Sequence, residues 1–323
     1  MDDYITRVIQ RKTPSKHYYI YYDKNNYPIR NKKEIKKICA DIYIPPAYDN
    51  VKIYTDKSRD IRAIGSDNKD RHQYIYNKSF TEKQSDKKYN HMSVFGRSFL
   101  KINRKITEDL YSVKDSKEKQ IAIILKLIMD CHFRVGNERY SKDNKSYGTT
   151  TLENRHLKIK NNTAKIEFIG KKKVKNTCTI KNKKLVRTLK SKKKYSKKND
   201  RLFTYRYKEK YYTVKPNDVN LYLKQFGQFT TKNFRTWGAN IELIKQLVKK
   251  SKNNDNKRKT LRESICKVSE KLHNTPGVCK SNYLDPSLVS LYKDNPKKFL
   301  NHFDTVKKEE LYKKYVYFLE GGL

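Results

Sequence analysis

Near residue 90 the chain changes from a strand-like to a helical pattern, and this change limits the folds open to it. Before residue 90, short segments rich in aromatic and β-branched residues alternate with turns, which is typical of a small sheet. These segments are 17–22, 51–54, 61–64 and 73–76. Beyond residue 90, apolar residues recur at helical spacing. We therefore predict an α+β protein with a β-rich N-terminal domain, residues 1–88, and a mainly α-helical C-terminal domain, residues 89–323.

The polar stretch 81–90 precedes the helical part, so we place the domain boundary there. Residues 117–133 predict a largely buried helix that ends near Gly136. Residues 157–180 predict strands joined as a hairpin. The basic run 181–200 predicts a solvated, mobile loop. Further helices are predicted at the segments 219–227, 261–272 and 305–320, with an exposed linker at 251–259.

The composition points to a polyanionic partner. The 323 residues include 76 Lys and Arg against 34 Asp and Glu, a formal charge of +42. Nucleic acid is the first candidate and an anionic membrane surface the second. The chain is also rich in Asn, Ile and Tyr, which AT-rich coding favours, so roughly half of the excess charge is attributable to drift on a solvated surface.

Several kinds of site are excluded by their missing motifs. The five cysteines are Cys39, Cys131, Cys178, Cys266 and Cys279. They form no C-x-x-C pair, so we expect reduced thiols rather than a disulfide framework or a zinc site. The sequence has no G-x-x-x-x-G-K-[ST], no H-E-x-x-H and no clustered carboxylates. We expect no cofactor, no catalytic metal and no bound nucleotide.

The sequence also lacks the marks of a membrane or secreted protein. No apolar run approaches the roughly 20 residues that a spanning helix needs. The first residues, M-D-D-Y-I-T-R, lack the apolar core of a signal peptide. We therefore expect a soluble intracellular protein that is not bound to a membrane.

Four residues in order along the chain suggest phosphodiester chemistry: Arg134, Lys171, Arg235 and Tyr283. A tyrosine oxygen can attack phosphorus and keep the bond energy as a phosphotyrosine. Two guanidiniums can bind the phosphate oxygens bidentately and stabilise the transition state. A lysine can protonate the departing sugar hydroxyl. Together these side chains can break and rejoin a phosphodiester without a metal.

Local patterns predict where these side chains lie. Arg134 follows the buried helix, where the chain passes into a loop, and Lys171 falls in the turn between two strands. Arg235 falls in a short helical stretch. Thr275 is a helix N-cap with Pro276 at the first position, which places Tyr283 about two turns along that helix. Taken singly, each residue has an ordinary reading: a phosphate contact, a hairpin lysine, or one of 26 tyrosines.

In these contexts the chain resembles the small type IB DNA topoisomerases of poxviruses, giant DNA viruses and some bacteria. The resemblance covers nearly the whole chain, with its motifs in the family's order. The N-terminal motifs are Y-I-P-P-A (43–47), A-I-G-S-D-N-K-D-R-H-Q-Y-I-Y (63–76) and F-G-R-S-F-L-K-I (95–102). The C-terminal motifs are C-H-F-R-V-G-N-E-R-Y (131–140), Y-G-T-T-T-L (147–152), F-I-G-K-K-K-V (168–174), F-R-T-W-G-A-N (234–240) and N-T-P-G-V-C-K-S-N-Y (274–283).

The resemblance implies an enzyme that relaxes supercoiled duplex DNA without ATP or metal, as a monomer. It implies that Tyr283 forms a 3′-phosphotyrosyl link, Arg134 and Arg235 hold the phosphate, and Lys171 protonates the leaving oxygen. Poxvirus members have a histidine immediately before T-P, whereas this chain has Asn274, with His273 one residue earlier. An asparagine amide can donate to a phosphate oxygen, so we assign this role to Asn274 and keep His273 as an alternative.

The resemblance also implies DNA contacts. Gln73, Tyr74 and Tyr76 match residues that touch DNA in the family, although Tyr74 and Tyr76 could simply share one face of a strand. Further candidates are Arg139, Tyr140 and Lys142, whose ordinary reading is a charged surface loop, together with Lys232 and His273. We expect a viral source to place the protein in the virion or viral factory, and a bacterial source to place it in the cytoplasm.

Two alternatives remain open from the sequence. A tyrosine recombinase shares the catalytic fold, but recombinases usually have histidine three residues before the second arginine, where this chain has Lys232. The small N-terminal sheet also favours the topoisomerase reading. A non-catalytic DNA-coating protein would explain the charge but would give Tyr283 no role.

Overall fold

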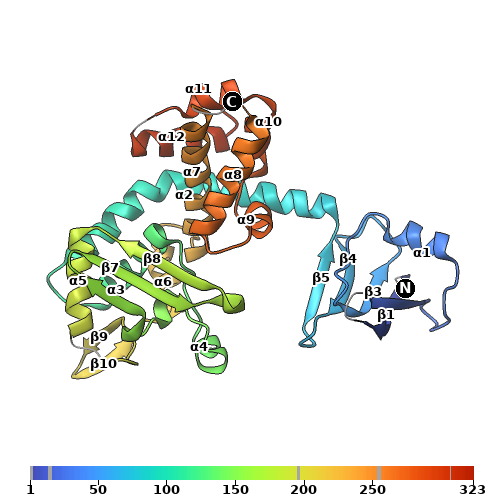
Figure 1. Ribbon diagram of the computed structural model, residues 1–323, viewed down its shortest axis with the longest axis horizontal. Helices are drawn as coiled ribbons and strands as arrows, with labels where there is room; N and C mark the ends of the chain where they lie inside the picture. Colours follow the sequence, from blue (N-terminus) through green and yellow to red (C-terminus); the bar gives the residue numbers. More distant parts are fainter. Residues whose placement is uncertain (1–2, 14–16, 195–196, 253–255, 306) are drawn as a thin grey trace. The chain divides into compact units, whose positions relative to one another are not determined.

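The computed structural model describes residues 3–13, 17–194, 197–252, 256–305 and 307–323. The chain divides into two compact units, Met1–Lys88 and Tyr89–Leu323 (Figure 1). The smaller unit is built around a sheet, and the larger unit is mainly helical with smaller sheets. The predicted α+β fold class is therefore confirmed.

Five antiparallel strands form the sheet of the smaller unit, in the order β2-β1-β3-β4-β5. Their bounds are β1 Tyr4–Lys12, β2 His17–Tyr22, β3 Asp49–Tyr54, β4 Ile61–Ser66 and β5 His72–Tyr76. All four predicted strands are present. A small core of Ile5, Val51, Ile53 and Ala63 lies beside helix α1, Lys32–Cys39. Ile38 and Cys39 of α1 pack against this core.

The sequence analysis missed strand β1 because a charged residue interrupts its apolar alternation. Arg7 lies in the middle of β1 and is only 4% exposed. Its Nη2 donates to the carbonyl oxygens of Pro45 at 3.0 Å and Tyr48 at 2.9 Å. These bonds satisfy part of a buried guanidinium, which makes an arginine acceptable on the inner face.

Helix α2, Lys78–Tyr111, runs across the boundary between the units, so the expectation that the polar stretch 81–90 precedes the helical part is wrong. Glu, Lys and Gln in this stretch are good helix formers, and a helix surrounded by water needs no apolar face. Buried residues of α2 begin at Tyr89. The polar residues of this stretch show that the start of α2 is exposed to solvent, not that it is unstructured.

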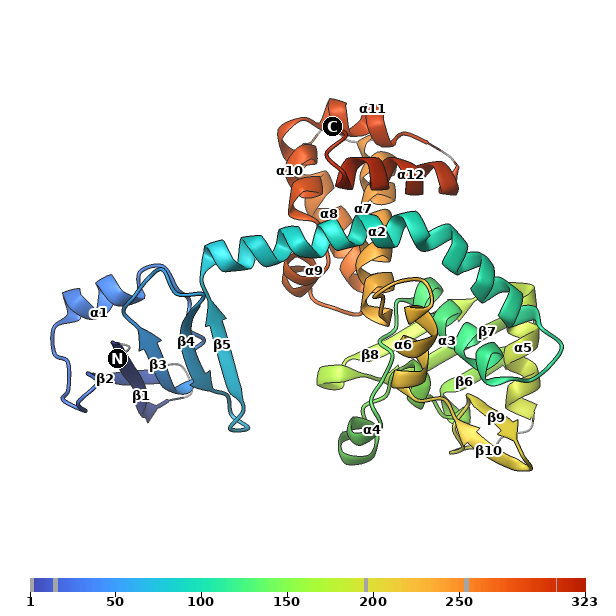
Figure 2. The same cartoon turned by 180° about the vertical axis from the view of Figure 1, so that it is seen from behind.

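The larger unit contains most of the helices (Figure 2). Their bounds are α3 Lys117–Cys131, α4 Glu138–Asn144, α5 Lys183–Lys194, α6 Pro216–Lys224, α7 Thr231–Ser251, α8 Lys257–Lys271, α9 Pro276–Asn282, α10 Pro286–Asp294, α11 Pro296–Phe303 and α12 Lys308–Leu319. One sheet has the order β6-β7-β8 (Leu157–Lys160, Thr163–Ile169, Lys175–Ile180), and β9 (Thr204–Tyr207) pairs with β10 (Lys210–Thr213). Short 3-10 turns are η1 Thr149–Thr151, η2 Asn154–His156 and η3 Lys171–Lys173.

Aromatic side chains of α2, α7 and α12 pack together in the core of this unit. The ring centroids of Phe95 and Phe234 are 5.0 Å apart, those of Phe99 and Tyr312 are 5.1 Å apart, and those of Trp237 and Tyr315 are 5.1 Å apart. A Cβ on Gly96 would lie 2.6 Å from the Trp237 ring, so glycine is required for this approach. This packing fixes α7, the helix that carries Arg235.

Several predictions for this unit need correction. Most of the basic run 181–200 is the helix α5 rather than a mobile loop, because Leu185, Val186 and Leu189 are buried at helical spacing. Residues 195–196 lie outside the described residues. Arg235 belongs to the 21-residue helix α7 rather than to a short stretch. The buried helix α3 ends at Cys131, with His132 as its left-handed C-cap, several residues before Gly136.

The remaining predictions for this unit agree with the structure more closely. The hairpin predicted over 157–180 is present as β6, β7 and β8. Helix α6 overlaps the predicted segment 219–227 but begins and ends three residues earlier, and α8 extends the predicted helix 261–272 at its start. The linker predicted at 251–259 is wrong at both ends, because Ser251 is the last residue of α7 and residues 257–259 form the start of α8, while residues 253–255 lie outside the described residues. The C-terminal segment holds α10 and α11 in addition to the predicted last helix.

The expectation of reduced cysteines is contradicted by a disulfide between Cys131 and Cys178. These residues are 47 positions apart, and their Cα atoms are 5.7 Å apart because the last residue of α3 packs against β8. Sequence spacing carries no sign of this contact. Cys39, Cys266 and Cys279 are free thiols, as expected.

We predict that replacing Cys131 and Cys178 by serine lowers the free energy of unfolding. Closing a loop of this length stabilises a folded chain by about 4 kcal/mol in the chain-entropy description. Urea unfolding without reductant measures the loss, and Cys266→Ser is the control because Cys266 is a free thiol. A reductant that leaves the unfolding midpoint of the unmodified protein unchanged would contradict the disulfide.

Candidate active site

Tyr283 lies at the C-terminal end of the short helix α9, where it is the C-cap. As predicted, Thr275 is the N-cap of α9, accepting a hydrogen bond from the Val278 amide, and Pro276 occupies the first turn. The Tyr283 carbonyl accepts from the Tyr89 hydroxyl at 3.2 Å and from the Asn240 amide at 2.9 Å. The backbone of Tyr283 is therefore held from both α2 and α7.

Arg235 lies inside the larger unit and is only 4% exposed. Its Nη2 donates to the Leu272 carbonyl at 3.2 Å and to the Tyr283 hydroxyl at 3.4 Å. The guanidinium carbon lies 5.1 Å from the centroid of the Tyr283 ring. Among the described residues, Nε and Nη1 of Arg235 have no hydrogen-bond partner. These two donors remain available to a phosphate beside Tyr283.

Arg134 approaches from the loop that follows α3. Its Nη2 donates to the Asn274 Oδ1 at 2.8 Å. The Arg134 carbonyl accepts from the amide and the hydroxyl of Thr149, at 2.8 and 3.0 Å. Because Arg134 takes the oxygen of Asn274, the Asn274 amide group is left as a donor. This Nδ2 is buried and has no partner in the described part of the chain.

His273 lies beside these residues without bonding to them. Its ring stacks on Phe133, with centroids 5.5 Å apart, and its backbone has a φ of 53°. Burial lowers the pKa of His273 below its ordinary value, and the charges of Arg235 and Arg134 lower it further. The His273 Nε2, like the Asn274 Nδ2, is buried and has no hydrogen-bond partner among the described residues, so this feature does not separate the two candidates.

Lys171 is exposed in η3, the turn between β7 and β8, where the sequence placed it. No hydrogen bond or ion pair within the described residues joins it to the other four candidates. The hairpin is tied to the segment after α4, because the Tyr147 amide donates to the Ile169 carbonyl at 2.8 Å, and Thr149 of the following turn donates to the Arg134 carbonyl. Lys171 therefore lies on a hairpin that is connected through hydrogen bonds to the Arg134 loop.

Electrostatics favour the ionised form of Tyr283. Burial by itself raises the pKa of the Tyr283 phenol. The charge and hydrogen bond of Arg235, with smaller contributions from Arg134 and Asn274, outweigh burial and lower this pKa below its ordinary value of 10.0. A tyrosine with a lowered pKa gives up its proton more readily, which makes its oxygen a better nucleophile.

Four DNA-contact candidates of the larger unit lie on its surface. Arg139, Tyr140 and Lys142 are exposed on α4, and Tyr140 is 52% exposed. Lys232 is exposed in the first turn of α7. Their exposure leaves them available to a ligand, and no contact in the structure identifies that ligand.

In the smaller unit, Tyr74 and Tyr76 are exposed on the same side of β5. Their rings stack with centroids 6.4 Å apart, and Tyr76 also stacks on Phe80 at 5.2 Å. The Gln73 amide donates to Asp67 at 3.2 Å. A row of exposed rings on an edge strand is an open aromatic surface.

Sequence reasoning missed the residues that hold the site from behind. Asn240 donates to the Tyr283 carbonyl and accepts from the Asp285 amide at 2.8 Å, and it is fully buried. Asn240 is the last residue of the motif F-R-T-W-G-A-N, and its place in that motif was the one sequence feature that could have identified it. Tyr89 lies in the polar stretch 81–90, which was expected to precede the helical part, so no sequence pattern indicated its role.

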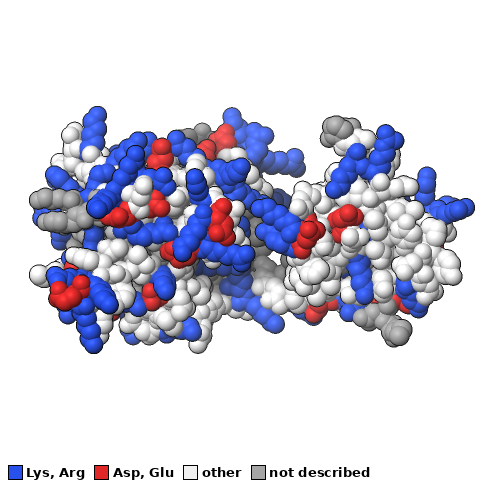
Figure 3. All heavy atoms as spheres, turned by 90° about the horizontal axis from the view of Figure 1, so that it is seen from below, with Lys and Arg blue, Asp and Glu red and all other residues white. Residues whose placement is uncertain are grey.

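Lys and Arg side chains are spread over the surface of both units, with fewer Asp and Glu among them (Figure 3). The described residues contain no group of three or more His, Cys, Asp or Glu placed to hold a metal ion. None of the helices in the described ranges combines the length and apolar character that a bilayer span requires.

We predict that Arg235→Gln raises the pKa of Tyr283. The variant removes the positive charge that stabilises the phenolate and leaves burial, which acts in the opposite direction. Titration of tyrosinate absorbance, taken as the difference from the Tyr283→Phe form in each background, measures this shift. Lys232→Gln removes a charge from the exposed start of the same helix and is the control. An unchanged pKa in Arg235→Gln would contradict the pairing.

Comparisons with known proteins match the chain along most of its length. Residues 77–310 match the family model of the eukaryotic DNA topoisomerase I catalytic core, and residues 18–67 match that of the bacterial DNA topoisomerase IB N-terminal domain. The chain is 32% identical to DNA topoisomerase 1B of Acanthamoeba polyphaga mimivirus over 307 residues, 91% of this chain and 90% of the relative. It is 24% identical to DNA topoisomerase 1B of Vaccinia virus (strain Copenhagen) over 297 residues, 89% of this chain and 90% of the relative.

Proposed function

Because the chain belongs to the type IB family of DNA topoisomerases, we propose that its supercoil-relaxing chemistry is carried out by Tyr283, Arg134, Arg235, Lys171 and Asn274. DNA is the substrate. The observation that carries this assignment is the contact of the Tyr283 hydroxyl with the buried Arg235 guanidinium. The tyrosine recombinase and the DNA-coating protein are not favoured, since the family matches cover both units.

In the proposed reaction, the Tyr283 oxygen attacks the scissile phosphorus and forms a 3′-phosphotyrosyl bond. The bond from phosphorus to the 5′ oxygen breaks, and the 5′ oxygen leaves as a hydroxyl after gaining a proton. Arg235 lowers the pKa of Tyr283 and presents Nε and Nη1, which have no partner among the described residues. The same guanidinium can therefore ready the nucleophile and bind the phosphate.

Arg134 and Asn274 act as a pair in this proposal. Arg134 holds the Asn274 oxygen, which turns the amide nitrogen toward the phosphate as a neutral donor. Arg134 has further guanidinium donors for the phosphate itself. A donor that is already oriented stabilises the transition state without reorganising, and losing one such donor typically costs roughly 10²–10³ in rate.

Lys171 supplies the proton to the leaving 5′ oxygen. Its exposed position at the tip of the β7–β8 hairpin supports this role, because a long side chain at a turn can reach into bound DNA. In the reverse step, the 5′ hydroxyl returns its proton to Lys171 and attacks phosphorus, and the bond from phosphorus to the Tyr283 oxygen breaks, which releases the tyrosine. The cut strand rotates about its partner between the two steps, so relaxation needs neither ATP nor metal.

We also propose which residues contact the DNA, in what oligomeric state the protein acts and where it acts. The two units bind one duplex, with Gln73, Tyr74 and Tyr76 of β5 as the DNA contacts of the smaller unit. On the larger unit, Arg139, Tyr140, Lys142 and Lys232 contact the DNA. The protein acts as a monomer without a nucleotide. Since the relatives named above are viral, it acts inside the infected cell, in the virion or viral factory.

We predict that Tyr283→Phe binds duplex DNA as tightly as the unmodified protein but forms no covalent adduct. Phenylalanine keeps the ring packing and removes only the nucleophilic oxygen. Relaxation of a negatively supercoiled plasmid in EDTA without ATP, with adduct capture by denaturant, measures the loss. Tyr317→Phe, at a tyrosine that is 56% exposed on α12, is the control. Relaxation by Tyr283→Phe would show that another residue is the nucleophile.

We predict that Lys171→Ala slows cleavage by roughly 10²–10⁴, the usual contribution of a general acid. A substrate with sulfur at the bridging 5′ position restores the rate, because a thiolate leaves without a proton. Single-turnover adduct formation on both substrates measures the effect. Lys173→Ala, in the same turn, controls for charge. If the sulfur substrate gives no rescue, Lys171 is not the acid.

A further inference from the structure

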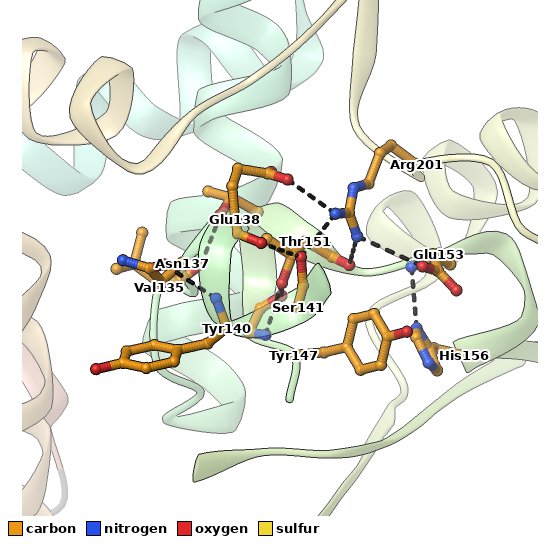
Figure 4. Close-up of polar contacts among 12 residues, drawn as sticks. Val135, Asn137, Glu138, Tyr140, Ser141, Tyr147, Thr151, Glu153, His156 and Arg201 are labelled. Atoms are coloured by element: carbon orange, nitrogen blue, oxygen red, sulfur yellow. Dashed lines mark hydrogen bonds and ion pairs between the residues drawn. The ribbon is translucent and has the colours of Figure 1, made fainter. Parts of the chain in front are cut away.

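Arg201 is the residue at which separate segments of the larger unit meet (Figure 4). Its Nη2 donates to the Glu138 Oε2 and to the Ser141 hydroxyl of α4, each at 2.8 Å. Its Nη1 donates to the Thr151 carbonyl at 2.6 Å and lies 3.5 Å from the Glu153 Oε1. The side chain is 18% exposed. One guanidinium thus joins α4 to the segment that precedes β6.

The backbone of Arg201 is itself fixed. The Leu202 amide donates to the Leu152 carbonyl at 2.8 Å, and the Asn154 amide donates to the Asp200 carbonyl at 3.0 Å. An isolated antiparallel bridge pairs Arg201 with Glu153. Because these bonds hold residues on both sides of Arg201, its side chain extends from a rigid support.

Helix α4 has little else to hold it. It is seven residues long, and Ser141 is its one buried residue. An isolated helix of this length is unstable in water, and most helices depend on an apolar face packed against the protein. Asn137 caps the first turn through the Tyr140 amide, which fixes the start of the helix but not its position. Among the described residues, the side-chain hydrogen bonds that join α4 to another element come from Arg201.

The same anchor reaches the loop that carries Arg134. Thr149 donates to the Arg134 carbonyl, and Thr150 donates to the Val135 carbonyl through its amide at 2.7 Å and its hydroxyl at 2.8 Å. Thr151, in the same short turn η1, is held by Arg201. Arg201 therefore supports both sides of the segment that runs from Arg134 into α4.

We infer that Arg201 is a positioning residue for the topoisomerase reaction. It holds α4 docked beside the Arg134 loop before DNA arrives, with Arg139, Tyr140 and Lys142 on the exposed side. A docked helix costs less ordering entropy when DNA binds than one that must form on the DNA. The inference rests on the proposed contact of α4 with DNA.

Hydrogen exchange in the absence of DNA tests the anchor. We expect the amides of residues 138–145 to exchange at least about tenfold faster in Arg201→Met, because losing charge-assisted hydrogen bonds favours local opening. Arg206→Met is the matched control: it removes the same charge from an exposed residue of β9 that pairs with Glu209. Equal exchange in the two variants would overturn the inference.

Adduct formation at varied DNA concentration tests the consequence for the reaction. In Arg201→Met we expect the DNA concentration for half-maximal rate to rise about tenfold, while the rate at saturating DNA changes far less. If Arg201→Met binds DNA normally, the variants Tyr140→Ala and Lys142→Ala show whether the proposed contact of α4 with DNA or the role of Arg201 is wrong. If they also bind DNA normally, the proposed contact of α4 with DNA fails. If they bind weakly while Arg201→Met binds normally, the role of Arg201 fails.

Two milder variants keep the test open should Arg201→Met fold poorly. Arg201→Lys keeps the charge but cannot span α4 and Thr151 with a planar fork, so it should restore only part of the affinity. Ser141→Ala removes one bond to Arg201 and should speed exchange of α4 by a smaller factor. Full wild-type behaviour of both variants would overturn the inference.

Discussion

A guanidinium buried without a carboxylate partner is the constraint on which the catalytic unit depends. Arg235 is 4% exposed, and within the described part of the chain it forms no ion pair; its partners are a carbonyl and the Tyr283 hydroxyl. Keeping an uncompensated charge out of water costs several kcal/mol. In the proposed reaction, a DNA phosphate would supply the negative charge that this guanidinium lacks, and the guanidinium would be in place before the phosphate binds.

The fold offsets this cost through the helix that carries Arg235. Phe234 and Trp237 flank Arg235 on α7 and are almost fully buried against α2 and α12. Each large apolar side chain buried in this way contributes roughly 1.5–3 kcal/mol. Asn240, one turn further along, then fixes the backbone of Tyr283. Helix α7 therefore contributes to the aromatic core, carries the buried charge of Arg235 and holds the backbone of Tyr283.

The sequence predicted features that local patterns encode and missed those that depend on long-range contacts. The strands β2 to β5, the Thr275 cap and the hairpin with Lys171 follow from spacing and turn residues. The strand β1 was missed because the buried Arg7 interrupts its apolar pattern, and the polar start of α2 was expected to lie before the helical part. The contacts of Arg201 and the Cys131–Cys178 bond were not predictable, since the residues that they join lie tens of positions apart along the chain.

The two hydrogen bonds to the Tyr283 carbonyl also have a mechanical consequence. In the proposed reaction, the cut DNA end is bound covalently to the Tyr283 side chain, and the untwisting duplex would exert torque and tension on that link. Tyr89 from α2 and Asn240 from α7 transmit this force into the aromatic core. The anchored end therefore stays in place while the other end turns, so the two broken ends can meet again after any number of rotations.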